Sequence, residues 1–168
     1  MTNYLKLIDE NTKGPRCDVT PLFADPAGFA ALVDDLYGQV KAVEFDLVGA
    51  IDALGFILGT ALALRHAAGL VTLRKGGKLP VETETAAFTD YSGQVKQLEV
   101  RKDVIYPGAR VLIVDEWVET GTQVRAAAQL IERVGGVVAG IAVIHADRNA
   151  HTGPLFEQYP CFALRYEE

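Results

Sequence analysis

A short segment in the second half of the chain combines acids, hydroxyls and glycine at a spacing suited to binding a phosphorylated sugar. Asp115 and Glu116 are followed by Thr120, Gly121 and Thr122. Glycine lets the backbone approach a ligand closely, and successive N–H groups at the start of a helix form a cradle for an anion, to which threonine hydroxyls add donors. Two carboxylates repel a bare phosphate, but they suit sugar hydroxyls, a Mg²⁺ ion or positive charge developing on a ring carbon. The segment therefore predicts a site for a sugar that carries a phosphate, the alternative being a helix cap after a solvated strand end.

The residues around this segment predict the elements that position it. VLIV at 111–114 is typical of a strand buried on both faces, and VVAGIAVIHA at 137–146 predicts a second one. Between them Gly135-Gly136 ends a helix. Its apolar positions recur at helical spacing: Val124, Ala127, Ala128, Ile131 and Val134. A strand–loop–helix–strand unit of this kind indicates an α/β fold with a parallel sheet covered on both sides, in which ligands bind at the carboxyl ends of the strands.

The rest of the chain predicts further elements, with no internal repeat or linker. Asp25-Pro26 predicts a helix start, with the aspartate as N-cap and the proline in the first helical position. We expect strands at 45–50 and 69–74, a buried helix at 54–68, a polar loop at 147–160 and a last strand at 161–166. Residues 81–103 alternate loosely in polarity and contain several threonines and a Ser-Gly pair, which indicates a hairpin or a mobile flap.

Length and composition place the chain among ordinary globular proteins. Its 168 residues, 49% of them hydrophobic, suit a single domain over residues 1–168. A net charge of −6 argues against binding to nucleic acid or to an anionic membrane. No apolar run is long enough for a membrane span. The fragment RKGGK at 74–78 nevertheless concentrates positive charge locally, and this charge would attract a phosphate.

The cysteines and histidines show neither disulfide nor metal-binding spacing. Cys17 and Cys161 lie far apart in the sequence, which favours free thiols and a cytoplasmic location. His66, His145 and His151 form no zinc motif, so each is expected to be structural or exposed.

Four stretches in register extend the pattern well beyond one loop. VLIVDEWVETGT, with two acids, a spacer and Thr-Gly, resembles the phosphoribosyl-pyrophosphate motif of the type I phosphoribosyltransferases. Matching stretches of adenine phosphoribosyltransferases occur in the same order as DVTPLFADPAGF at 18–29, GFILGTALA at 55–63, RKGGKLP at 74–80 and LEVRKDVIYPGARVLIVDEW at 98–117. Together they cover most of residues 14–145. The resemblance implies the type I phosphoribosyltransferase fold, a parallel sheet flanked by helices with a mobile flap hairpin.

The same resemblance implies a reaction and a set of residues. The reaction is transfer of a 5-phosphoribosyl group from phosphoribosyl pyrophosphate to a purine base, with Mg²⁺, in a homodimer. Asp115 and Glu116 would be catalytic, holding the ribose hydroxyls and the metal. The 5-phosphate would be surrounded by Glu119, Thr120, Gly121, Thr122 and Gln123. The pyrophosphate would meet Arg74, Lys75 and Lys78, which in a dimer would serve the neighbouring site.

The family's flap carries a Glu-Tyr pair near the purine, and its nearest equivalent here is Asp90-Tyr91. Asp90 is therefore a candidate acid and Tyr91 a candidate contact to the base, with an exposed turn carboxylate as the alternative for Asp90.

Several positions depart from the family pattern at the expected site. Arg16-Cys17-Asp18 stands where Phe-Arg-Asp is usual, so a guanidinium replaces an apolar wall against the purine. Leu54 replaces an arginine expected near the pyrophosphate, and Glu119 places a carboxylate beside the phosphate. Trp117 is a bulky residue next to the acids, suited to stacking on a base or ribose or to packing against the following helix.

These departures leave three hypotheses. The first is a working purine phosphoribosyltransferase, for adenine or a related base, favoured by the retained acids, the Thr-Gly loop and RKGGKLP. The second is a sensor that binds a phosphoribosyl compound or nucleotide without turnover, favoured by Cys17, Leu54 and Glu119. The third is a structural partner protein with a relict fold.

Overall fold

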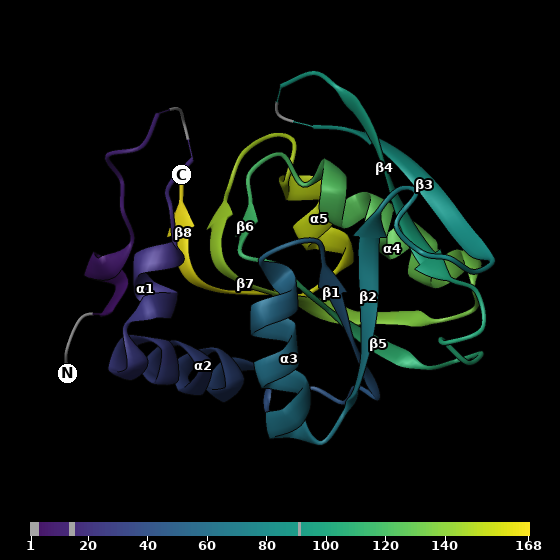
Figure 1. The fold of residues 1–168 in the computed structure, drawn as a ribbon, viewed down its shortest axis with the longest axis horizontal. Coiled ribbons are helices and arrows are strands. Elements are labelled where there is room, and N and C mark those ends of the chain that lie inside the picture. Colours follow the sequence, from purple (N-terminus) through teal and green to yellow (C-terminus); the bar gives the residue numbers. More distant parts are fainter. Residues whose placement is uncertain (1–3, 14–15, 91) are drawn as a thin grey trace.

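The computed structural model describes residues 4–13, 16–90 and 92–168, which form an α/β fold around one eight-stranded sheet (Figure 1). The strands are β1 (Leu47–Ile51), β2 (Gly69–Lys75), β3 (Thr83–Thr89), β4 (Val95–Arg101), β5 (Arg110–Val114), β6 (Trp117–Val118), β7 (Val137–Asp147) and β8 (Cys161–Glu167). The helices are the 3₁₀ turn η1 (Tyr4–Leu7), α1 (Thr20–Ala24), α2 (Pro26–Val40), α3 (Gly55–His66), α4 (Thr122–Arg133) and α5 (Gly153–Gln158). The predicted fold class is confirmed.

Parallel pairing dominates the sheet, whose order is β3-β4-β2-β1-β5-β7-β6 with β8 also paired to β7. Strand β1 pairs in parallel with β2 and β5, and β7 pairs in parallel with β5, β6 and β8. Only the edge formed by β3 and β4 runs antiparallel, as the predicted hairpin at 81–103. Its mobility stays a prediction.

Two apolar layers lie on opposite faces of the sheet. Helices α2 and α3, with η1 and α1, bury one layer around Leu32, Leu36 and Leu58. Helix α4 and the hairpin bury the other, in which Leu130 and Ile131 lie with Leu98. Figure 1 shows α3 beside β1, α2 to the left of α3, and the β3–β4 hairpin extending over α4. The hairpin is thus part of the fold's packing and is positioned beside the start of α4.

Local chemistry accounts for the elements that the sequence predicts. The Asp25 side chain accepts a hydrogen bond from the Gly28 N–H at 2.6 Å, so it caps α2 as expected. The four residues that follow Arg110 in β5 are completely or almost completely buried, in keeping with a strand covered on both faces. In α4 the apolar positions from Val124 to Ile131 face the core, and Val134 packs against it.

Two short elements differ from the sequence-based expectation. The segment expected as a loop after Glu116 contains β6, because Trp117 and Val118 pair with His145 and Ala146 of β7. The expected polar loop at 147–160 contains α5, so that expectation is wrong. Helix α5 forms because Leu155 is fully buried against the core beside α4, an interaction that polarity along the sequence does not reveal.

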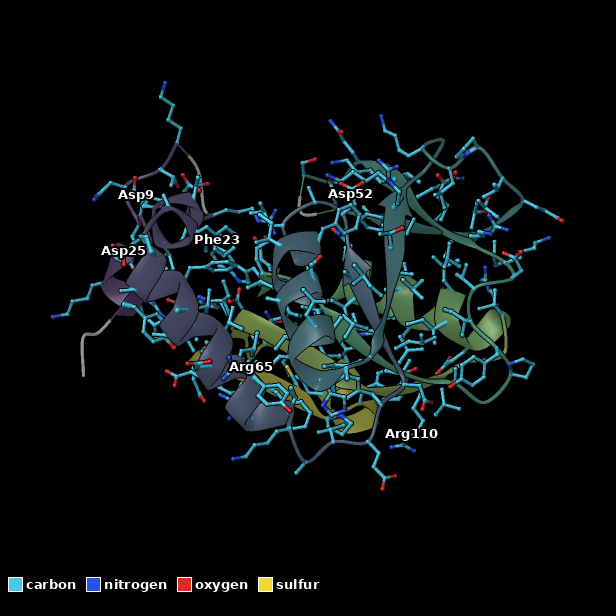
Figure 2. The ribbon with its side chains drawn as sticks, turned by 60° about the horizontal axis from the view of Figure 1, so that its bottom comes forward. Asp9, Phe23, Asp25, Asp52, Arg65 and Arg110 are labelled. Atoms are coloured by element: carbon cyan, nitrogen blue, oxygen red, sulfur yellow. The ribbon has the colours of Figure 1, made fainter. Side chains whose placement is uncertain are left out.

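The carboxyl ends of the central strands share one edge. Figure 2 shows Asp52, directly after β1, at the opposite end of the sheet from Arg110, where β5 begins. Since β1 and β5 are parallel, Asp115, directly after β5, lies at the Asp52 end. Within the described ranges, no helix combines the length and the apolar character needed to cross a membrane.

Candidate active site

The two acids that follow β5 occupy different environments. Asp115 is 5% exposed, and its carboxylate accepts the Glu116 N–H at 2.9 Å. Burial, reinforced by the neighbouring charge of Glu116, raises the pKa of Asp115 well above its usual value. The Glu116 carbonyl accepts the N–H groups of Ile144 and His145, both at 3.1 Å, which fixes this strand end against β7. A positive ligand, or a hydroxyl donor, would relieve the unfavourable burial of the Asp115 charge.

A cavity of about 190 Å³ lies above the loop that leads into α4. Gly121 adopts a φ of 72°, a left-handed conformation that favours glycine, and serves as the N-cap of α4. The first N–H groups of a helix have no intrahelical partner, so they are available to an anion in this cavity. The lining residues are Arg16, Lys75, Phe88, Asp90, Lys96, Trp117, Val118, Glu119, Thr120, Gly121, Thr122, Gln123 and Val124.

The threonine hydroxyls of this loop face each other and the hairpin. Thr120 and Thr122 place their Oγ1 atoms 3.1 Å apart, and Thr122 Oγ1 donates to the Thr89 carbonyl at 2.7 Å. The end of β3 is therefore hydrogen-bonded to the start of α4. Thr120 and Thr122 both line the cavity, and a phosphate bound there would compete with the Thr89 carbonyl for the Thr122 hydroxyl.

Arg16 lies over the site. Its Nε is 3.6 Å from Glu119 Oε2, and its Nη2 is 3.9 Å from Glu116 Oε1. The guanidinium carbon also lies 5.8 Å from the centre of the Trp117 ring. Arg16 therefore brings positive charge to the two carboxylates that face the predicted phosphate and ribose positions, including the Glu119 carboxylate that is unfavourable beside a phosphate.

A second cavity of about 190 Å³ lies on the other side of Arg16 and Trp117. Most of its wall is apolar, and Glu116 closes one side. It is lined by Ile8, Arg16, Cys17, Val19, Leu54, Glu116, Trp117, Ile144 and His145. Burial raises the pKa of the Cys17 thiol, with the charge of Glu10 adding to the effect. A small flat heterocycle with polar edges fits a cavity of this kind, between an apolar floor and an aromatic ring.

Trp117 is held by β7 rather than by the following helix. Its ring stacks on His145 with centroids 4.6 Å apart, and its Nε1 donates to Asp147 Oδ1 at 2.9 Å. Burial lowers the pKa of His145, although Asp147 and Glu167 act in the opposite direction. With one face covered by His145, the Trp117 ring borders both cavities.

The basic segment is organised by a buried carboxylate. Glu99 on β4 is 4% exposed and accepts the N–H groups of Gly77, Lys78 and Leu79 at 2.6–2.9 Å. Burial alone would raise the pKa of Glu99, but these three donors together lower it. Lys75 reaches the cavity above α4, whereas Lys78 is exposed and does not line it. Arg74 faces Asp52, with Nε 3.8 Å from Oδ2.

The hairpin residues give a mixed outcome. Asp90 lines the cavity, but its carboxylate accepts from Ser92 and Gln94 and pairs with Lys96. Lys96, followed by Ser92, holds the pKa of Asp90 far below its usual value. Asp90 is thus engaged in the turn, and its role as an acid stays a prediction. Tyr91 lies outside the described residues.

A phosphoribosyl transferase domain matches residues 23–164. This chain belongs to the phosphoribosyltransferase family. Curated relatives named adenine phosphoribosyltransferase include one from Chlorobium phaeovibrioides, 44% identical over 129 residues, which are 76% of this chain and 72% of the relative. Another, from Leuconostoc citreum, is 40% identical over 145 residues, 84% of this chain and 81% of the relative.

Solved structures of the same family superpose over nearly the whole chain. Adenine phosphoribosyltransferase from Thermoanaerobacter pseudethanolicus gives a TM-score of 0.89 at 30% identity and covers 97% of each chain. The APRTase from Giardia lamblia, complexed with 9-deazaadenine, gives 0.88 at 28% identity, covering 99% of this chain and 97% of that one. The predicted resemblance to this family is confirmed.

Sequence analysis did not identify some of the residues that line these two cavities. Phe88 and Lys96 line the cavity because the hairpin folds over α4, and Ile144 joins the second cavity from β7. For Phe88 and Lys96, the only signal in the sequence was the alternation of polarity within 81–103, which predicted the hairpin but not its position. No local signal linked Glu99 to the loop twenty residues before it.

Proposed function

We propose that this chain transfers the 5-phosphoribosyl group of phosphoribosyl pyrophosphate to a purine base, adenine by analogy with its relatives, and releases pyrophosphate. The observation that supports the proposal is that the 119–123 loop and Lys75 line one cavity, while Arg16 links Glu119 of that loop to Glu116, which borders the second cavity and follows Asp115 at the carboxyl end of β5. This arrangement occurs in a chain 40–44% identical to proteins named adenine phosphoribosyltransferase.

In this reaction the bond from ribose C1 to pyrophosphate breaks as a bond to a purine nitrogen forms, and the base loses a proton. The loop Glu119–Gln123 would hold the 5-phosphate through the first N–H groups of α4. Asp115 and Glu116 would accept hydrogen bonds from the ribose hydroxyls and offset positive charge on the ring. Lys75, and Arg74 after leaving Asp52, would meet the leaving pyrophosphate.

The donor set suits Mg²⁺. Asp115 and Glu116 offer the hard oxygen ligands that this ion prefers, and Mg²⁺ is commonly held by one or two carboxylates together with substrate phosphates. Burial opposes ionisation of Asp115, so a cation would satisfy its charge. The metal would supply neutralisation of charge on the pyrophosphate.

The purine would occupy the second cavity, against Trp117. Leu54 and Ile144 supply the apolar floor, while Glu116 and the Arg16 guanidinium supply polar edges. Arg16 takes the place of the family's phenylalanine, so a cation would border the base where an apolar ring is usual. For Asp90 to act as the acid, the hairpin must first release its contact with Lys96.

The test is pyrophosphate release from phosphoribosyl pyrophosphate and Mg²⁺ in the presence of adenine, hypoxanthine, guanine or xanthine, each supplied separately. We expect steady release with adenine, and Asp115→Asn should abolish it while calorimetric binding of the substrate persists. Binding without release for every base would contradict the enzyme and favour the sensor. None of the relatives described above supports that alternative. If phosphoribosyl pyrophosphate does not bind at all, both the enzyme and the sensor are contradicted, and only the fold assignment remains.

We further propose a homodimer in the cytoplasm. Three apolar side chains are exposed on α3 and β2: Ile57, Leu64 and Leu70. Lys78 does not line the cavity of its own chain, but in a dimer it would contact the pyrophosphate bound by the second copy. The free thiols Cys17 and Cys161 suit a reducing compartment. A monomer alone in size-exclusion chromatography would contradict the pairing.

A further inference from the structure

A cluster of three potential metal ligands lies against Trp117. His145 and Asp147 belong to β7, two residues apart and therefore on the same face of the strand, and Glu167 lies beside Asp147 in the parallel pairing of β8. One nitrogen or oxygen from each side chain lies within 4.8 Å of the others. None of the three residues has a role in the chemistry proposed above, although His145 also lines the second cavity.

The geometry of His145 indicates a missing ligand. Its Nε2 lies 3.1 Å from Asp147 Oδ1 and 3.2 Å from Glu167 Oε2, yet it makes no hydrogen bond of acceptable geometry to either. The side chain is 7% exposed, so water does not readily satisfy this nitrogen. Ligands about 2.1 Å from a metal are separated from each other by about 3.0–3.4 Å in octahedral or tetrahedral sites. Both distances match that separation.

The surroundings fit a metal centre with an entry path. Asp147 Oδ1 also accepts the Trp117 N–H, which orients it in the way that outer partners orient metal-ligating carboxylates. Glu167 has a side chain that is 57% exposed, so an ion can enter from solvent. Arg165 on β8 pairs with Glu10 at 2.6 Å, although its charge also acts on Glu167 and His145.

We propose that His145, Asp147 and Glu167 bind one divalent transition-metal ion, best suited to Zn²⁺. Imidazole favours Zn²⁺ over Mg²⁺, and one histidine with two carboxylates provides three ligands while solvent completes the coordination. The bound ion ties β8 to β7 and fixes Asp147 and His145, the two residues that hold Trp117. It thereby stiffens the wall shared by both cavities.

The test uses untagged full-length protein, treated with a chelator and then titrated with ZnCl₂ by calorimetry in the absence of phosphoribosyl pyrophosphate. Trp117 is the only tryptophan and stacks on His145, so its fluorescence provides a second readout. We expect one saturable site, and the same site should be filled by Co²⁺ with quenching of Trp117. Excess Mg²⁺ should not compete.

Glu167→Gln should weaken Zn²⁺ binding by at least the 10- to 100-fold that loss of an outer partner causes at metal sites. The matched control is Glu168→Gln, an exposed neighbour with the same chemical change, which should bind as the wild type does. Asp147→Asn, with its folding checked by thermal unfolding, should also lose the site. No saturable binding, equal binding by Glu167→Gln, or loss of binding on alkylation of Cys17 and Cys161 would overturn the proposal. None of these outcomes depends on transferase activity.

Discussion

Arg16 and Glu119 should act as a coupled pair in substrate binding. Each replaces a different residue of the family pattern, and each alone introduces a charge next to the predicted phosphate position. Arg16 Nε lies 3.6 Å from Glu119 Oε2, and Arg16 Nη2 lies 3.9 Å from Glu116 Oε1. We therefore expect Arg16 to cancel the repulsion that Glu119 exerts on the 5-phosphate.

The magnitude follows from distance and exposure. Two unit charges 4 Å apart interact by about 1 kcal/mol in water and about 4 kcal/mol at an effective dielectric constant near 20. The side chains of Arg16 and Glu119 are 38% and 25% exposed, so the lower limit applies, consistent with the roughly 0.2–1 kcal/mol measured for exposed pairs. A coupling of about 1 kcal/mol corresponds to about a fivefold change in affinity.

Calorimetric titration with phosphoribosyl pyrophosphate and Mg²⁺ measures this coupling in a double-mutant cycle. Arg16→Ala should weaken binding by about 5- to 30-fold, because it leaves both Glu116 and Glu119 facing the phosphate and costs about 1–2 kcal/mol. Glu119→Gln should bind as well as the wild type or better. In the double variant the loss should be smaller by the coupling energy of about 1 kcal/mol.

Arg65→Ala provides the control, since Arg65 pairs with Asp34 at 2.6 Å between α3 and α2, far from the site (Figure 2). It should leave affinity unchanged. Additivity of the two single variants within about 0.3–0.5 kcal/mol would refute the coupling. So would an Arg16→Ala effect that does not shrink with added salt, because partly exposed charges are screened.

Three further changes test the scaffold. Gly55→Ala should lower the thermal midpoint by roughly 2–12 °C, because a Cβ there would lie 2.6 Å from the Val114 carbonyl oxygen. Gly38→Ala, at an exposed position of α2 where a Cβ meets no atom within 4 Å, should not lower it. Glu99→Gln should cost about 2 kcal/mol at neutral pH. Since the folded-state pKa of Glu99 is depressed, the wild type's advantage is present above the unfolded pKa near ~4.3, and acid titration of unfolding should show it disappear as the pH falls through the folded pKa. Asp115→Asn should raise stability by about 0.5–2 kcal/mol in denaturant unfolding, because burial and the Glu116 charge oppose ionisation of Asp115. The same change should abolish pyrophosphate release.

Elements with a strong local pattern were predictable. The α2 cap is formed by the side chain directly before its proline, and the apolar spacing of α4 places its buried face without any knowledge of the partner. The strand at 111–114 is apolar at every position because both its faces are covered. In each case the residues that define the element lie within a few positions of one another.

Short elements were not predictable, because distant partners create them. The two residues of β6 gain their strand conformation by pairing with β7, and α5 is stabilised where Leu155 enters the core beside α4. An isolated helix as short as α5 is unstable in water, so its own composition carries little information. The cluster of His145, Asp147 and Glu167 has the same origin, since register between β7 and β8 brings it together.

In the candidate site, the contact between Arg16 and Glu119 was likewise not predictable from the sequence. From the sequence, Arg16 removes an apolar wall and Glu119 weakens a phosphate cradle, so each departure counts separately against the family's chemistry. Their contact changes this conclusion, because an opposite pair restores the local net charge that two neutral residues would have had. What the pair does not restore is the apolar surface against the base. The departures at Arg16 and Glu119 therefore bear more on which base is accepted than on whether phosphoribosyl pyrophosphate binds.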